Sequence, residues 1–273
     1  MNDVSINKFY YLIGSNLIES NGITNLNITK ELSFANNFVL GQTVSPMQIN
    51  SPQEIKINFD RDYVNKDDLL QYTGSNYIQN AYLFDGNKYY ELSNLYLMNY
   101  SASFSVGELP KIKTSFVSFG GDINQLNSIN LSNKTIQIPN LDIPKLSSIS
   151  LSGVEAYDNV IKNIYNIISF DYSIDINRQP FYGIGAGLQP TEVYSLLPLP
   201  IRFSITSKVK NEQSTIDMPS IINDNLNFDV VVTGSYGKTN YEIRNAQMVQ
   251  SEIISNSNDV FEVKRNFLGY YGI

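Results

Sequence analysis

The sequence predicts a mostly β protein made of two tandem β-barrel or β-sandwich domains, each with at most one short helix. Three observations predict this fold: a strand-forming composition, an apolar–polar alternation with a period of two, and a pattern that occurs twice along the chain. Charged residues make up only 16% of the 273 residues, and aromatic residues, all of them Tyr or Phe, make up 12%. Asn, Ser, Ile and Tyr are frequent, and this composition favours strands and turns over long helices.

The repeated pattern begins with a strand that follows a proline. Residues 52–59 and 198–205 each start with Pro and continue with an apolar, basic, apolar, polar, apolar alternation. A period of two is typical of a strand with one buried face. Upstream of these strands, residues 26–30 match residues 174–178, and a glycine-containing stretch follows in both places. Each half therefore predicts one hairpin with a long arm.

Two further segments repeat downstream, in the same order. Residues 89–94 match residues 240–245, and both follow a glycine turn, which predicts a strand, a turn and a strand. The final strand pair, 98–105 with 112–117, matches 246–253 with 260–264. All matches fall at an offset of about 146 to 151 residues, and self-similarity at a nearly fixed offset indicates a tandem duplication. We expect Ile55 to superpose on Ile201, Glu91 on Glu242 and Ser101 on Ser251, to within a residue or two.

The duplication suggests where the domains lie. We expect a first domain over residues 1–122, a linker with the leading edge of the second domain over 123–160, and a second domain over 161–273. Prolines in residues 138–144 interrupt any central strand there. Helical signals are sparse: residues 65–70 resemble a helix start with an acidic first turn, and residues 155–168 have apolar residues near helical spacing.

The residue types that are missing exclude several kinds of chemistry. The chain has no Cys and no His, which removes Ser-His and Cys-His nucleophiles, most zinc sites and disulfides. Its net charge is −7 without a basic cluster, which argues against tight binding to a phosphate backbone. No apolar run near the N-terminus is long enough for a signal peptide or a membrane span. We therefore expect a non-enzymatic protein with no catalytic, metal or cofactor site, no membrane association, and stability that comes from packing or assembly.

Two motifs have a chemical interpretation that the sequence does not favour. Residues 183–188 resemble a nucleotide-binding loop, but Leu188 stands where the third glycine belongs, and no Lys-Ser or Lys-Thr follows. Residues 60–62 with Asp67 and Asp68 offer carboxylates to calcium, but they do not follow the EF-hand pattern. A solvated loop before a helix is the favoured interpretation of this acidic segment. A pair of carboxylates for glycoside hydrolysis is not excluded, because their separation is spatial.

Two longer segments resemble known proteins. Residues 94–110, which run into a second strand ending at Phe119, resemble the C-terminal hairpin of bacteriophage tail tube domains. Residues 168–180, together with the strand that begins Pro200-Ile201-Arg202-Phe203, resemble the long hairpin that precedes it in those domains. The first half departs from this pattern after Lys30, where Glu31-Leu32-Ser33 replaces the Arg-x-Pro corner.

This resemblance implies a domain of tail-tube type and a structural role in the virion. In such proteins the sheets of neighbouring subunits join into a closed ring, rings stack into a hollow tube, and an acidic lumen conducts DNA during ejection without binding it specifically. The partners implied are the chain itself and other tail proteins such as the tape measure, terminator and baseplate, with assembly in the host cytoplasm. The alternatives are a neck, tail-terminator or baseplate ring protein of the same fold, a cell-surface glycan-binding β-sandwich, and, as the third choice, an enzyme.

The resemblance also implies an assembly arm in each half. Residues 183–194, and less strongly residues 37–46, lie between paired strands and are rich in Gly, Pro and small polar residues, as contact loops are. The candidate contact residues are Gly183, Gly185, Gly187, Pro190, Tyr194, Gly41 and Pro46. Because tail tube rings usually present six tube domains, a chain with two such domains should close as a trimer; the competing arrangement is a hexamer.

Overall fold

Strands form nearly all of the regular structure. The computed structural model describes residues 8–32, 34–36, 47–49, 53–64, 67–74, 76–139, 141–145, 148–152, 166–183, 189–210, 226–234, 237–257 and 260–271. The elements up to residue 126 are β1 (Lys8–Ile13), β2 (Asn16–Ser20), β3 (Ile23–Glu31), β4 (Phe34–Asn36), β5 (Met47–Ile49), β6 (Glu54–Asp62), the 3₁₀ helix η1 (Asp68–Thr73), β7 (Ile78–Phe84), β8 (Tyr89–Ser105), β9 (Lys111–Phe119) and β10 (Asn124–Leu126). The remaining strands are β11 (Lys134–Gln137), β12 (Ile149–Ser152), β13 (Ile167–Asp175), β14 (Arg178–Phe181), β15 (Glu192–Ser195), β16 (Leu199–Lys210), β17 (Leu226–Gly234), β18 (Gly237–Ser257) and β19 (Val260–Tyr271). The expectation of a mostly β protein is thus confirmed.

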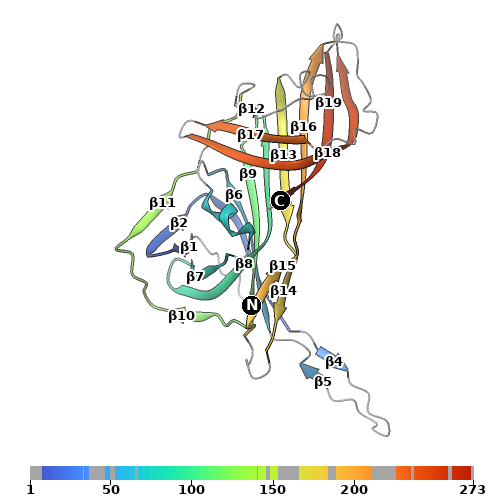
Figure 1. Cartoon of the computed structure of the whole chain (residues 1–273). Coiled ribbons are helices and arrows are strands. Elements are labelled where there is room, and N and C mark those ends of the chain that lie inside the picture. Colours follow the sequence, from blue (N-terminus) through green and yellow to red (C-terminus); the bar gives the residue numbers. More distant parts are fainter. Residues whose placement is uncertain are drawn as a thin grey trace.

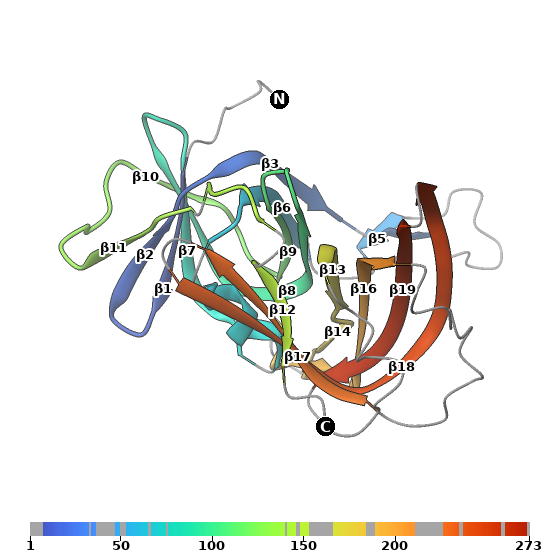
Figure 2. The same ribbon diagram turned by 90° about the horizontal axis from the view of Figure 1, so that it is seen from above.

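One branched sheet of 15 strands connects most of the chain (Figure 1). Its wall contains eight antiparallel strands in the order β3-β6-β9-β8-β13-β16-β19-β18. The wall is curved when it is seen along the strands (Figure 2). Two ribbons, β4–β5 and β14–β15, form separate two-stranded sheets, and both lie at the same end of the wall in Figure 1.

The strand order of the first half recurs in the second half. In the first half β3 pairs with β6, β6 with β9, β9 with β8, β8 with β7, and β7 with β1. In the second half β13 pairs with β16, β16 with β19, β19 with β18, β18 with β17, and β17 with β12. All of these pairs are antiparallel. The two halves therefore have the same strand order and orientation, and β8 joins them by pairing with β13.

Irregular backbone positions also recur. Asn94 and Asn245, at corresponding places in β8 and β18, have positive φ angles of 54° and 50°. The ladder between β8 and β9 shifts at Met98, and the ladder between β18 and β19 shifts at the corresponding Val249 and at two further places. Because bulges and left-handed residues re-aim a strand at a defined place, their recurrence indicates that the two walls bend alike.

One sequence match is displaced. With Ile57 and Phe203 as equivalent residues, Ile28 lies opposite Ile57, and Tyr172 lies opposite Phe203. Ile28 therefore corresponds to Tyr172, and not to Ile176 as the sequence comparison suggested. The match of residues 26–30 with residues 174–178 is corrected to one that begins four residues earlier in the second half. A period-two pattern matches itself at every even shift, so alternation alone does not fix the register.

The segment predicted as linker is shared between the halves. β10 pairs with β8, and β11 pairs in parallel with β2, so residues 124–137 extend the first half. β12 pairs with β17 and extends the second half. The helix start predicted at residues 65–70 corresponds to η1, whereas most of the second predicted helix, residues 155–168, lies outside the described residues.

The hydrophobic core runs continuously through both halves. Phe9 from β1 packs against Phe59 and Phe116 of the first half of the wall. Tyr241 from β18 packs against Phe104 of the first half and Phe170 of the second half. One face of the wall is therefore apolar and covered, which leaves the opposite face to present polar side chains to solvent.

Candidate assembly surfaces

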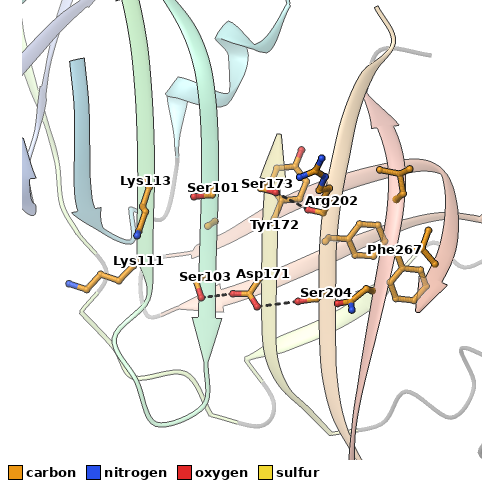
Figure 3. Close-up of a pocket in the computed structure, with 15 residues that line it drawn as sticks. Ser101, Ser103, Lys111, Lys113, Asp171, Tyr172, Ser173, Arg202, Ser204 and Phe267 are labelled. Carbon is orange, nitrogen blue, oxygen red and sulfur yellow. Dashed lines mark hydrogen bonds between the residues drawn. The ribbon is translucent and has the colours of Figure 1, made fainter. Parts of the chain in front are cut away.

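The junction between the two halves is an antiparallel strand pair in the middle of the wall. Residues 99–105 of β8 face residues 169–175 of β13, with Ser101 opposite Ser173. On the core face, Phe104 and Phe170 stack with their ring centroids 6.2 Å apart. On the polar face, Asp171 accepts hydrogen bonds from Ser103 at 2.5 Å and from Ser204 at 3.1 Å (Figure 3). Backbone ladder, aromatic packing and side-chain bonds together join the halves edge to edge.

A shallow groove of about 510 Å³ follows this junction on the polar face. Side chains from β8, β9, β13, β16, β18 and β19 line it, and Figure 3 shows them on neighbouring strands. Its charged side chains are Lys111, Lys113, Arg202 and Asp171. Lys111 is paired with Asp62 at 2.6 Å. The acidic lining that the tube resemblance implies is not present in this groove, which carries charges of both signs.

The two ends of the wall are open strand edges. Among the described strands, β3 pairs only with β6, so its outer edge is open. From Gln250 onward, β18 pairs with β19 on one edge, and no described strand covers its other edge. Unpaired edges of this length invite pairing with another chain. The wall therefore offers one edge for pairing at each end.

The candidate arm residues of the second half are only partly described. Gly183 follows β14, and its backbone N–H donates to the Thr191 hydroxyl at 3.0 Å. Pro190 precedes β15, and Tyr194 lies in β15 with 49% of its surface exposed. Gly185 and Gly187, as well as Gly41 and Pro46 of the first half, lie outside the described residues. The contact role of all seven residues stays a prediction.

Arg178 anchors the ribbon β14–β15 on the first half. Its buried guanidinium donates to three backbone carbonyls: Leu97 at 2.9 Å, Gly74 at 2.6 Å and Tyr72 at 2.7 Å. Burial lowers the pKa of Arg178 to about 10, so the group stays charged at neutral pH. It is the arginine of the Arg-x-Pro corner, and the structure assigns it a bridging position that its sequence context alone does not indicate.

A small apolar cluster supports the same ribbon. Val193 of β15 packs with Tyr96, Val117 and Phe119 of the first half, and Met98 lies against this cluster. The ribbon of the second half is therefore seated on strands β8 and β9 of the first half.

Within the acidic segment before η1, Arg61 and Asp67 form a buried ionic network, whereas Asp60, Asp62 and Asp68 are partly exposed. Arg61 lies in β6 and forms a fully buried ion pair with Asp67 at 2.5 Å. Asp67 also caps η1 by accepting from the backbone N–H of Leu69 at 3.1 Å, and it accepts from the Tyr100 hydroxyl at 2.8 Å. Burial, followed by the Asp67 charge, raises the pKa of Tyr100 well above its usual value, so it remains a donor. The expected solvated loop before a helix is therefore corrected only at Asp67, which caps η1 but is buried. A buried charge needs partners of this kind, and the sequence does not display them.

Neither a cluster of metal-binding side chains nor a membrane-spanning helix occurs among the described residues. No group of three or more Asp or Glu side chains in this part of the chain is placed to hold a metal ion. No described helix has the length and apolar character that are needed to cross a bilayer. No protein-family model matches the sequence, and a search of curated proteins finds no significant match.

Proposed function

We propose that this chain is a structural subunit of a bacteriophage tail tube and consists of two tandem copies of one tube domain. The observation that carries the proposal is the repeated strand order, joined edge to edge through β8 and β13. The β8–β13 pairing within one chain is thus an example of how two such units can associate. A wall that extends by edge pairing and leaves an open edge at each end is suited to a closed ring, because closure removes both edges.

The two ribbons support stacking of such rings. β4–β5 follows the first wall strand of one half, and β14–β15 follows the first wall strand of the other, so both occupy the same place in the repeat. Both lie at the same end of the wall (Figure 1), where β14–β15 packs on β8 and β9 of the first half. Two ribbons on one end would give each ring a set of arms that reach toward the next ring.

The polar face of the wall is compatible with a conduit. Its central groove is lined by Ser101, Ser103, Ser173 and Ser204 together with the charged side chains of Asp171, Lys111, Lys113 and Arg202. Tight DNA binding requires lysines or arginines that displace counterions, whereas Lys111 is already neutralised by Asp62. Lys113 and Arg202 are the remaining cations of the groove, and two cations would give DNA a weak, salt-sensitive contact rather than tight binding.

Electron microscopy of the purified protein tests this function. Hollow tubes of stacked rings are the expected result. Single rings that never stack would instead indicate a neck, terminator or baseplate protein. Dispersed monomers at all concentrations would contradict an assembly role, and binding to a glycan array would then test the β-sandwich alternative.

A further inference from the structure

The β8–β13 junction is a template for a contact between copies of the chain. In the repeat, β18 takes the place of β8, and β3 takes the place of β13. The ladder shifts agree with this: β3 shifts at Thr24 and β13 at Ile168, each one residue after the start of its ladder. Each chain thus contains one occupied junction, the β8–β13 pair. It also has two unpaired edges that correspond to the two sides of such a junction: β18 at one end of the wall (the open half on β18) and β3 at the other end (the open half on β3).

The open half on β18 presents apolar side chains to solvent. Val249, Ile253 and Ile254 are 62%, 47% and 53% exposed. Their counterparts on β8 are Met98, Ala102 and Ser103, and of these Ala102 is buried and Met98 packs beside Val193. A cluster of exposed aliphatic residues on a strand edge indicates a surface that another chain covers.

The open half on β3 offers matching side chains. Leu26 and Ile28 pack against the core from this edge strand and are only partly buried. They occupy the places of Phe170 and Tyr172, which are buried at the occupied junction. Beyond them, Glu31 occupies the place of Asp175, which accepts a hydrogen bond from Asn99.

We infer that β18 of one copy pairs antiparallel with β3 of a second copy in the register of the β8–β13 junction. Transferring that register places Glu252 opposite Thr29 of the next copy, and Ile253 opposite Ile28. It also places Gln250 opposite Glu31, so that an amide again faces a carboxylate, as Asn99 faces Asp175. We call this contact between β18 of one copy and β3 of the next the seam. It would close the ring, so the inference rests on the proposed function.

The seam joins two different edges, and this decides the kind of assembly. A contact between unlike surfaces is heterologous, so it produces a ring or a filament and not a two-fold dimer. The ribbon β4–β5 follows β3, so it would arrive beside Val249 of the preceding copy, as β14–β15 arrives beside Met98 within the chain. Exposure of Val249 is consistent with this second contact.

Thiol cross-linking tests the register directly. The chain has no native cysteine, so introduced cysteines are the only thiols. The double variant Thr29→Cys/Glu252→Cys places thiols directly opposite each other across the seam, where side chains are about 5 Å apart. Treatment with an oxidant or a short bis-maleimide is expected to link most chains into closed covalent rings, resolved on a denaturing gel.

Three control variants make the result specific. Ser101→Cys/Ser173→Cys places the same pair at the occupied junction and should cross-link within one chain, which calibrates the chemistry. Asn27→Cys/Glu252→Cys is two residues out of register and should link at least fivefold less. The single variants Thr29→Cys and Glu252→Cys should not form covalent dimers.

The outcomes separate the seam from the tube. Efficient linking in the shifted register, or dimers from a single variant, would overturn the inferred pairing. Tubes that form without cross-linking of the in-register pair would also overturn it while the tube function stands. Cross-linked rings that never stack would support the seam and count against the tube.

Discussion

At the level of single residues, buried charges hold peripheral strands to the wall. Glu19 of β2 is almost fully buried and pairs with Lys8 at 2.8 Å and with Lys134 of β11 at 2.7 Å. β11 is only four residues long, and this carboxylate ties it to β2 in addition to their backbone pairing. Burial acts to raise the pKa of Glu19, but the hydrogen bonds from Lys134 and Lys8 outweigh it and lower the pKa.

Because of the Glu19 carboxylate, the free energy of unfolding should depend on pH in the acid range. A lowered pKa in the folded state means that ionised Glu19 stabilises the fold above pH 4.5, and that this contribution is lost as the pH falls through the lowered value. Glu19→Gln should lower the free energy of unfolding at pH 7 by about 1–3 kcal/mol and flatten its acid dependence. Urea unfolding between pH 3 and about 7 measures both effects. Glu108→Gln, exposed in the turn between β8 and β9, is the control, and equal behaviour of the two variants would contradict the prediction.

The left-handed asparagines give a second prediction at this scale. Asn94 and Asn245 have positive φ angles, which a β-branched residue adopts only with strain. Asn245→Val should destabilise the fold by about 1–2 kcal/mol, and Asn94→Val should have the same effect, whereas Asn→Gly at either site should be nearly neutral. Chemical denaturation of the four variants measures this. A valine that is tolerated at one position and not at the other would contradict the equivalence of the two sites.

At the level of elements, the proposed stacking of rings needs the ribbons, whereas the folding of the wall does not. Deleting residues 183–187 should abolish stacking of rings and leave rings that are folded and closed, because the wall strands are untouched. Negative-stain microscopy and circular dichroism measure assembly and folding separately. A variant with the same five residues replaced by Gly and Ser separates loop length from side-chain contacts. Tubes of normal length from the deletion variant would show that the arm assignment is wrong.

The sequence predicted these elements where the signal is local. The Pro-led strands correspond to β6 and β16, and the final hairpins correspond to β8–β9 and β18–β19. Residues 89–94 and 98–105, predicted as separate strands, are one strand, because a left-handed Asn94 and a bulge bend the chain without ending it. The first strand pair was matched in the wrong register, because an alternating pattern matches itself equally well at every even shift.

Features that depend on contacts between distant segments could not be predicted from the sequence. Pairing of β8 with β13 and of β11 with β2 joins segments far apart in the chain, and no residue pattern encodes which edges meet. The Arg61–Asp67–Tyr100 network was missed because single charged residues on a strand predict a solvated face. A charged residue at a position that the period of two assigns to the core is the one signal that could have identified Arg61.

At the level of the whole molecule, the two halves lie side by side in one wall. Both contribute the same four wall strands, and both carry a ribbon after the first of them. The segment between the halves does not need to span a distance, since β10 and β11 belong to one half and β12 to the other. A single core passes through the junction. Both halves are therefore part of the wall, and neither lies on the outside of a wall formed by the other half.

This arrangement favours a ring of three chains. If each chain supplies two adjacent wall units, six units require three copies, and the ring has pseudo-sixfold symmetry with three occupied junctions and three seams. A hexamer with six wall units would instead need one half of each chain to leave the wall, which would break the β8–β13 ladder and expose Phe104 and Phe170. Native mass spectrometry of an isolated ring, or symmetry averaging of a tube segment, should give three chains per ring. Six chains would contradict the pseudo-sixfold arrangement and leave the tube proposal in place, with one half of every chain outside the wall.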